Sequence, residues 1–277
     1  MRSTVLSAIN RILKGVCVNC RLCFSTISKP FSSAKIFGHD VCYFECESCG
    51  YIQTEEPTWL DRAYTSPINP SDTGIMARNL SNVRIVMATL SLLGSRSGKV
   101  VDYAGGHGFL VRLLRDVGVD ALWADPYTEN LVARGFEYTG QQRVTLVTAF
   151  EAFEHFVNPV EEMQKLISIA PNILFTTDLA PTPTPMPSEW WYYGLDHGQH
   201  IGFYKVDTLQ YLADRFGLYL LSDGSVHLFT RKKYPLYKWR ILRYIARFMF
   251  NALQAGLESK TWTDHLEISE SGSNRIT

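Results

Sequence analysis

A glycine-rich run near the middle of the chain follows an acidic residue and could hold a ligand that carries hydroxyl or amino groups. Asp102 ends a short apolar stretch, and the small residues after it are Ala104, Gly105, Gly106 and Gly108. Small residues let backbone N–H groups approach a ligand closely, and a carboxylate accepts hydrogen bonds from a hydroxyl or an amine. The pattern predicts a buried strand, a tight loop and the start of a helix.

Two classes of cofactor use such a loop, and the glycine spacing separates them. A dinucleotide site requires G-x-G-x-x-G, but Val111 stands where the third glycine would be. The alternative spacing, Asp-x-small-x-Gly-x-Gly, is met by Asp102, Ala104, Gly106 and Gly108. The loop alone is a weak signal, so the segments that follow it decide between the two classes.

A second acidic residue ends the next predicted strand. Asp125 follows the apolar stretch at 121–124 and precedes Pro126. It stands about 20 residues beyond the glycine-rich loop, where a carboxylate at the carboxyl edge of an open α/β sheet can accept both ribose hydroxyls. We therefore expect Asp125 to bind a ribose. The alternative is an N-cap for the helix that we predict after it.

The third predicted strand runs into residues that could transfer a proton. The strand expected at 144–150 ends in Phe150 and Glu151, and Glu154 and His155 follow. A neighbouring glutamate and histidine at a strand end can act as a proton relay. Alternatively, the carboxylate caps a helix and the histidine is hydrogen-bonded within the loop.

A long segment rich in aromatic residues follows the fourth predicted strand. Four prolines at alternate positions in 181–187 favour an extended loop, which leads into the segment 190–204. This segment combines aromatic residues with Asp196, His197, Gln199 and His200. We expect it to cover the carboxyl edge of the sheet and to bind a polar, ring-shaped substrate by stacking and hydrogen bonding. The alternative is a packed aromatic lid whose histidines have structural partners.

All six cysteines lie in the first 50 residues. The pairs Cys20-x-x-Cys23 and Cys46-x-x-Cys49 have the spacing of a four-cysteine zinc site, in which each pair supplies two thiolates from a tight turn. A small module with little core gains its folding energy from such a metal, so we expect a structural role. Disulfides are the competing interpretation, and they require an oxidising compartment. Cys17 could replace one zinc ligand, and Cys42 is the other additional cysteine.

The composition predicts a globular protein without a strong electrostatic preference for nucleic acid. Lys and Arg total 27, as do Asp and Glu, and 46% of the residues are hydrophobic. The apolar stretch at 5–9 is too short for a signal peptide, and no uncharged apolar run approaches the roughly 20 residues that span a bilayer. We expect a cytoplasmic protein.

The elements that must position these residues alternate between strand and helix. Strands are predicted at 99–102, 120–124, 144–150, 172–177, 217–221 and 226–230, and helices at 79–93, 108–117, 127–134, 159–169 and 206–216. This alternation indicates a mainly parallel sheet that ends in an antiparallel hairpin. Flanking it we expect a helix over 1–15 and a zinc module, together residues 1–60. The central domain would span 61–232, and a C-terminal part 233–277.

These motifs, in this order, resemble one family of enzymes. The loop at 102–108 resembles motif I of class I S-adenosylmethionine (SAM) methyltransferases, with Ala104 at its first glycine, and the segment 150–159 resembles their post-strand motif. The motifs that carry the wider resemblance are the cysteine pairs, Tyr64-Thr65-Ser66-Pro67-Ile68, Trp190-Trp191-Tyr192-Tyr193 and Gly198-Gln199-His200-Ile201. Together they are similar to those of bacterial methyltransferases of sugar and polysaccharide biosynthesis. The chain also looks like a shortened relative of the nucleotide-sugar C-methyltransferases.

The resemblance implies a class I methyltransferase fold, SAM as cofactor, and a sugar or nucleotide-sugar as methyl acceptor. It implies that Phe150 and Glu151 pass beside the cofactor, with Glu154 and His155 at the mouth of the site. In the larger enzymes a Tyr-x-Glu-His element supplies catalytic groups. Here only His200 carries over, because Gln199 replaces the acid and His197 replaces the tyrosine.

Direct methyl transfer requires alignment of donor and acceptor and a group that accepts a proton. Because a histidine titrates near neutral pH, we expect His200 to be the general base, with His155 as second choice. An RNA methyltransferase and a non-catalytic SAM-binding scaffold are the alternatives. Overall neutrality counts against RNA, and the histidine-rich segment counts against a scaffold.

Between Arg231 and Arg247 the chain has seven Lys or Arg residues and no acidic residue, interleaved with aromatic and aliphatic side chains. Such a basic amphipathic helix, expected within 233–250, can dock on its own domain, lie on an anionic membrane surface or bind RNA. Residues 256–277 are predicted to be a mobile polar tail.

Overall fold

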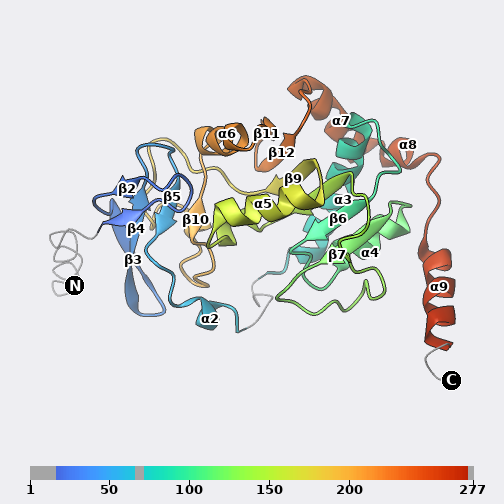
Figure 1. The fold of residues 1–277 in the computed structure, drawn as a ribbon, viewed down its shortest axis with the longest axis horizontal. Helices are drawn as coiled ribbons and strands as arrows, with labels where there is room; N and C mark the ends of the chain where they lie inside the picture. Colours follow the sequence, from blue (N-terminus) through green and yellow to red (C-terminus); the bar gives the residue numbers. More distant parts are fainter. Residues whose placement is uncertain (1–16, 66–71, 274–277) are drawn as a thin grey trace. The chain divides into compact units, whose positions relative to one another are not determined.

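The computed structural model describes residues 17–65 and 72–273 and shows a mixed α/β fold (Figure 1). The helix predicted over 1–15 and the residues Ser66, Pro67 and Ile68 of one sequence motif lie outside the described residues. Within them, strands and helices alternate through most of the chain from residue 100 to residue 219, but no helix lies between the strands that end at 124 and begin at 146.

Six strands form the central sheet in the order β11-β12-β9-β8-β6-β7. They are β6 (Val100–Tyr103), β7 (Ala121–Ala124), β8 (Leu146–Ala149), β9 (Asn172–Thr176), β11 (Tyr219–Asp223) and β12 (Val226–Thr230). β6 pairs in parallel with both β7 and β8. Because only two residues join the neighbouring strands β11 and β12, this pair is an antiparallel hairpin. The predicted parallel sheet with a final hairpin is confirmed.

Four of the five predicted helices are present. They are α3 (Ile75–Leu92), α4 (Phe109–Asp116), α5 (Pro159–Ile169) and α6 (Val206–Arg215). α3 begins at Ile75, earlier than the predicted start at residue 79. α4 packs against both α3 and β7, so the glycine-rich loop is held between a buried strand and a packed helix.

The helix predicted over 127–134 is wrong, because bends and a turn occupy this stretch. Asp125 Oδ1 accepts the backbone N–H of Tyr127 at 2.8 Å, and the carbonyl of His107 accepts the N–H of Leu131 at 3.1 Å. Backbone donors that a helix would satisfy internally are satisfied here by a side chain and by another loop. The alternative role of Asp125 as a helix N-cap is wrong for the same reason.

The N-terminal part contains a two-stranded and a four-stranded sheet. β1 (Val18–Asn19) and β2 (Thr26–Ile27) form the first, and β3 (Ser32–Ile36), β4 (His39–Glu45) and β5 (Ile52–Thr54) form most of the second. The remaining strand, β10 (Gly202–Phe203), comes from much later in the sequence and pairs with β5. A short helix, α2 (Leu60–Ala63), and two 3₁₀ turns, η1 (Phe153–His155) and η2 (Trp191–Tyr193), lie in the connecting segments.

The chain forms two compact units, each assembled from several segments. One comprises Met1–Asn69, Glu151–Lys165 and Phe175–His227, and the other comprises Pro70–Phe150, Leu166–Leu174 and Leu228–Thr277. The first contains the cysteines and the histidines of the segment 190–204. The second contains the glycine-rich loop and the C-terminal helices. The division that we predict at residues 60 and 232 stays a prediction.

The C-terminal part folds into three helices, α7 (Leu236–Phe248), α8 (Phe250–Gln254) and α9 (Thr261–Ser273). α7 packs against α3, where the fully buried Trp239 donates a hydrogen bond from Nε1 to Thr89 Oγ1 at 3.1 Å. The face of α7 that carries Trp239 therefore docks within its own unit, which is one of the three roles that we considered for this segment.

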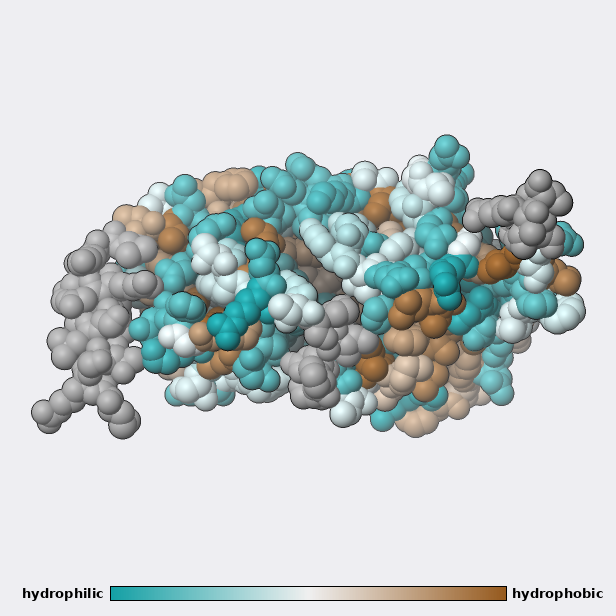
Figure 2. Space-filling model, turned by 90° about the horizontal axis from the view of Figure 1, so that it is seen from below, coloured by the Kyte–Doolittle hydropathy of each residue, from teal (hydrophilic) through white to brown (hydrophobic). Residues whose placement is uncertain are grey.

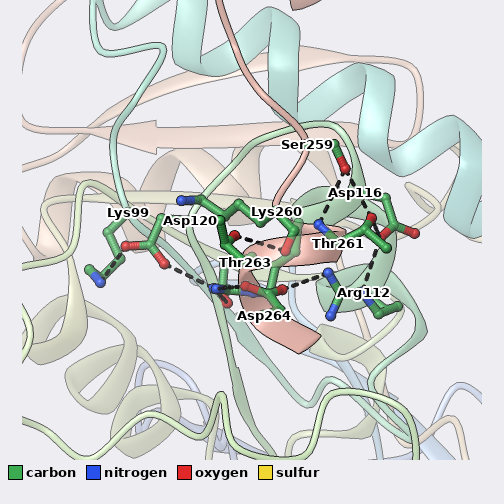
Figure 3. Close-up of polar contacts among 11 residues, drawn as sticks. Lys99, Arg112, Asp116, Asp120, Ser259, Lys260, Thr261, Thr263 and Asp264 are labelled. Carbon is green, nitrogen blue, oxygen red and sulfur yellow. Dashed lines mark hydrogen bonds and ion pairs between the residues drawn. The ribbon is translucent and has the colours of Figure 1, made fainter. Parts of the chain in front are cut away.

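The expectation of a mobile polar tail is wrong for residues 261–273, which form α9. Asp264 is only 3% exposed and accepts two hydrogen bonds from the buried Arg115, each at 2.7 Å. Arg112 donates a third, also at 2.7 Å (Figure 3). A bidentate arginine–carboxylate pair has a fixed geometry, so these contacts hold the helix in place.

The face shown in Figure 2 is largely hydrophilic, with hydrophobic residues gathered toward one side. None of the helices in the described residues combines the length and the hydropathy that are needed to cross a bilayer.

Candidate functional site

The glycine-rich loop adopts a backbone that favours small residues. Ala104, Gly106 and Gly108 have positive φ values of 58°, 53° and 89°. A Cβ atom at Gly108 would lie 2.9 Å from both Ala133 Cβ and Asn130 Oδ1, whereas a Cβ at Gly106 would meet nothing within 4 Å. The loop is therefore tightly packed at Gly108, and it leaves open space beside Gly106 where a ligand can approach the backbone.

Asp102 lies at the end of β6 with 4% of its surface exposed. Its Oδ1 accepts a hydrogen bond from Thr148 Oγ1 at 2.6 Å. Burial raises the pKa of Asp102 to about 7, and the charge of Asp125 acts in the same direction, while the Thr148 hydrogen bond opposes the rise. The carboxyl group therefore changes its protonation state near neutral pH, which is unusual for an aspartate.

Asp125 joins the glycine-rich loop to the loop after β7. Its Oδ2 accepts the backbone N–H of Gly106 at 2.9 Å, while Oδ1 accepts the N–H groups of Tyr127 and Thr128 at 2.8 and 3.0 Å. Trp123 adds a parallel link, because its Nε1 donates to the carbonyl of Gly106 at 2.7 Å. The structure thus brings together Asp102, Asp125 and the loop at 104–108, as the sequence predicts.

The residues after β8 take up a constrained turn. Glu151 has a φ of 50°, its N–H donates to Thr176 Oγ1 at 2.9 Å, and its Oε1 accepts a hydrogen bond from the same hydroxyl at 2.7 Å. Phe150 is half-buried, whereas Pro126 after β7 is exposed. Glu151 is thus oriented by Thr176 and not by a helix.

Glu154, His155 and His200 form a cluster whose ligand-type atoms all lie within 4.8 Å of one another. His200 Nδ1 lies 2.6 Å from the carbonyl of Tyr192, and His155 Nδ1 lies 3.0 Å from the carbonyl of Gln199. Because a carbonyl only accepts, each Nδ1 carries the proton, and in the neutral ring Nε2 is the acceptor. Three groups of this kind could accept a proton or contact one divalent cation.

Burial shifts the pKa of each member of this cluster. It lowers the pKa of His155 to about 4 and that of His200 well below its usual value, with neighbouring histidines adding to the effect on both. It raises the pKa of Glu154 to about 8, and the charge of Glu151 raises it further. At neutral pH the two imidazoles are therefore neutral, and Glu154 is mostly protonated.

The carboxyl group of Glu154 is fully buried, and neither of its oxygens has a hydrogen-bond partner among the described residues. Buried carboxyl groups without a partner are rare because desolvation without compensation is costly. Next to it, the rings of His155 and His200 lie 5.0 Å apart, and His197 lies 4.8 Å from His200. His197 Nδ1 accepts the backbone N–H of Gln199 at 3.2 Å.

The aromatic residues of the segment 190–204 do not form the stacking surface that the sequence suggests. Tyr192 and Tyr193 are buried in a hydrophobic core together with Tyr43 and Phe203. Trp191, by contrast, is 76% exposed. The alternative of a packed aromatic segment is correct for the two tyrosines, because the β10–β5 pairing draws this segment onto the N-terminal sheet.

Four cysteines come together from the turns of two hairpins, β1–β2 with Cys20 and Cys23, and β4–β5 with Cys46 and Cys49. Cys20 Sγ lies 3.6 Å from Cys49 Sγ, and Cys23 Sγ lies 3.4 Å from Cys46 Sγ. All four sulfur atoms lie within 4.8 Å of one another. A tetrahedral zinc site with Zn–S bonds of about 2.3 Å requires sulfur separations of about 3.8 Å, whereas a disulfide requires about 2.05 Å. The predicted grouping is confirmed, and the disulfide alternative does not fit these distances.

Several neighbours of the site were not predicted. Thr148 is a polar residue inside the apolar strand β8, and that contrast was the available signal. Trp123 gave no signal, because a tryptophan in a strand is ordinarily a core residue. Tyr64 belongs to a motif that carried no role, and its hydroxyl lies 2.9 Å from His155 Nδ1.

A comparison with known families decides the class of protein. Residues 76–223 match the methyltransferase domain family, and this stretch is more than half of the 277-residue chain. The chain belongs to that family. It contains a methyltransferase domain, and the predicted fold and enzyme class are confirmed. No curated protein matches the sequence of this methyltransferase.

Solved structures similar to the methyltransferase include other methyltransferases. The plantazolicin methyltransferase BpumL in complex with SAH shares 10% identity, with 69% of this chain and 88% of that chain covered and a TM-score of 0.42. An O-methyltransferase family protein from Burkholderia thailandensis shares 15%, covers 62% and 66%, and has a TM-score of 0.40. CalO1, a calicheamicin-biosynthesis methyltransferase in its SAH-bound form, shares 15%, covers 53% and 54%, and has a TM-score of 0.37. The methyltransferase spans about half the length of CalO1.

Proposed function

We propose that the methyltransferase uses SAM to methylate a small polar acceptor in the cytoplasm, a sugar or nucleotide-sugar of glycan biosynthesis. The observation that carries the SAM proposal is the open space beside Gly106, whose backbone N–H donates to Asp125 Oδ2. The backbone of Ala104, Gly105, Gly106 and Gly108 would line the cofactor, and Pro126, Phe150 and Glu151 would complete its surroundings.

The two aspartates would bind different parts of SAM. Asp102 would accept hydrogen bonds from the amino group of the methionine part, and a nearby cation would draw its carboxyl group toward the ionised form. Asp125 would bind the ribose through Oδ2, because Oδ1 already accepts two backbone N–H groups, whereas Oδ2 accepts one and keeps a lone pair for a ribose hydroxyl. Bound SAM supplies an electrophilic sulfonium methyl group.

The acceptor would be handled by the cluster of Glu154, His155 and His200. We propose that Nε2 of His200 accepts the proton of the acceptor hydroxyl, because burial keeps this imidazole neutral and its Nδ1 is held by a backbone carbonyl. Glu154 supports this proposal, because its unpartnered carboxyl group would hydrogen-bond a polar acceptor. His155 is the second candidate for the base, and His197 would orient His200.

We also propose that Cys20, Cys23, Cys46 and Cys49 hold a structural zinc ion, which the sulfur separations support. The thiolates would bind the metal in a closed site, and the two hairpins that carry them would then fold as one module.

The experiment that tests the function is methyl transfer from radiolabelled SAM to a panel of nucleotide-sugars. With an active acceptor, His200→Gln should lower kcat by about 10²–10⁴-fold while SAM affinity is unchanged. Asp125→Asn should instead weaken SAM binding, measured by calorimetry. Lys165→Gln, at an exposed side chain of α5, is the control and should leave both kcat and SAM affinity unchanged.

Three results would contradict the proposal. Full turnover by His200→Gln would remove the base assignment. Restoration of a chelator-treated enzyme by added Mg²⁺ or Mn²⁺ would assign the cluster to a metal in place of proton transfer. Transfer to RNA, with binding that weakens steeply as salt rises, would replace the sugar acceptor by a nucleic acid.

A further inference from the structure

α7 presents a row of large apolar side chains to solvent. Tyr237, Ile241, Tyr244 and Phe248 are each between 54% and 67% exposed. Their spacing of four, three and four residues places them on one stripe of the helix. At about 100° per residue, this stripe lies on the side opposite Trp239 and Ala246, which are buried against the domain. An apolar stripe that points away from the core is not explained by the packing of α7.

The stripe is bordered by positive charge. Lys232, Lys233 and Lys238 are exposed, as is Arg247, whose guanidinium lies 5.4 Å from the centre of the Phe248 ring. The sequence from 231 to 257 contains no Asp or Glu. α3 and α8, which pack against α7, contain no acidic residue either. On α7 and on these two neighbouring helices, the charged side chains are therefore all basic.

We propose that this face of α7 binds the surface of an anionic phospholipid bilayer. The tyrosine and phenylalanine rings would enter the headgroup region, and the lysines would contact lipid phosphates and carboxylates. A polar, positively charged border around exposed aromatic residues matches this occupant better than an acidic protein, which would leave the apolar stripe without a complementary surface. Membrane contact is independent of the proposed methyl acceptor.

The packing of α7 suits this role. Trp239 and its hydrogen bond to Thr89 fix the helix to α3, so the exposed stripe is preformed and does not have to fold on binding. The rings of Tyr244 and Phe248 lie 4.7 Å apart and form one continuous apolar surface. With only 13 residues, α7 would lie along the membrane and not across it.

Sedimentation of the full-length protein with vesicles tests the proposal. We expect binding to phosphatidylcholine vesicles that contain about 30% phosphatidylserine, weak binding to phosphatidylcholine alone, and loss of binding as salt rises. Lys232→Gln with Lys233→Gln should weaken partitioning about fivefold for each cation removed. Tyr244→Ser with Phe248→Ser should remove most of the binding at every salt concentration.

Trp262→Ser on α9 is the matched control, because Trp262 is 67% exposed and lies outside the stripe. It should bind vesicles like the wild type. Equal binding to neutral and anionic vesicles, no vesicle binding, or unchanged binding of the α7 variants would each overturn the proposal. So would salt-sensitive binding of single-stranded RNA in place of vesicles, or a dimer that the same variants abolish. The lipid and salt comparisons use the wild-type chain, so they do not depend on how a variant folds, and methyl transfer to soluble acceptors is scored separately.

Discussion

Two aspartates border the same loop in different surroundings. Asp125 accepts hydrogen bonds from backbone N–H groups with both of its oxygens. Asp102 has a single hydroxyl partner and is almost fully buried, which raises its pKa to about 7. One aspartate therefore serves as a fixed brace for the loop, whereas the other can exchange a proton when a cation arrives.

This difference predicts a pH-dependent affinity for SAM. If Asp102 binds the SAM amino group, it must be ionised in the complex, so binding releases a proton wherever free Asp102 is protonated. Affinity should fall by about tenfold for each pH unit below 7 and level off above it. Calorimetry in two buffers of different ionisation enthalpy would measure the released proton.

Asp102→Asn is the control for that titration, because the amide has no proton to release and should leave a weak, pH-independent affinity. The folding stability of the unliganded protein should change with pH in the opposite direction to the SAM affinity. A raised folded pKa contributes stability at low pH that is lost as pH rises from about 4 through about 7. If Asn at this position kept the full pH dependence of SAM binding, another group would be titrating.

At the level of elements, the sequence predicts the strands and helices that have a periodic pattern of apolar residues. Most strands of the six-stranded sheet are largely buried and apolar, β11 being the exception, and all six lie near their predicted positions. β10 could not be predicted, because two residues carry no periodic pattern and its partner β5 is distant in sequence. α9 is not predicted because its main contact joins Asp264 to Arg115, which is far away in the sequence.

Some parts of the candidate site could likewise be predicted from the sequence, and others could not. Glycine spacing and strand-end acids located Asp102 and Asp125, because those residues act where the chain itself places them. The core role of Tyr192 and the unpartnered carboxyl group of Glu154 depend on which segments pack together. Such properties arise from tertiary contacts, for which a single sequence offers no local pattern.

Asp264 gives a stability prediction at the level of α9. Asp264→Asn leaves the buried Arg115 without its main counter-charge, and breaking a buried pair in this way should cost about 3 kcal/mol of unfolding free energy. Urea unfolding measures this cost. Asp72→Asn, which breaks the more exposed pair with Arg78, should cost less than about 1 kcal/mol. Equal effects of the two substitutions would show that Asp264 does not anchor the helix.

The pairing of β10 with β5 gives a second stability prediction. A Cβ atom at Gly202 would overlap the hydroxyl of Tyr51, so Gly202→Ala should destabilise the protein by about 1–3 kcal/mol. Removing that hydroxyl with Tyr51→Phe should restore most of the loss in the double variant. Urea unfolding of the two single variants and the double variant forms a complete cycle. Additive effects would mean that the two groups do not collide.

At the scale of the whole molecule, the unit that contains the cysteines is assembled from three stretches of the chain. Arg21 extends this connection, because its backbone N–H donates to Gln53 Oε1 at 2.7 Å and its guanidinium donates to the carbonyl of Ile201. The cysteine cluster is thus linked to the strand that follows His200. Loss of the cluster's geometry should affect the whole unit and not the hairpins alone.

Metal analysis tests this dependence. The purified methyltransferase should contain about one zinc ion per chain, and a strong chelator should lower its thermal midpoint. Cys49→Ser should lose the metal and the stability together. Cys17→Ser and Cys42→Ser are matched controls that should keep both, since neither sulfur belongs to the cluster. Retention of zinc by Cys49→Ser would exclude the four-cysteine site.

The late arrival of β10 has a consequence for synthesis on the ribosome. The four cysteines are translated within the first 50 residues, whereas Gly202 and Phe203 follow roughly 150 residues later, which corresponds to about 8–30 s of elongation. During that interval the nascent hairpins have an open edge at β5. A metal ion captured early would hold them together until the closing strand is made, so zinc supply during translation should set the yield of correctly folded chains.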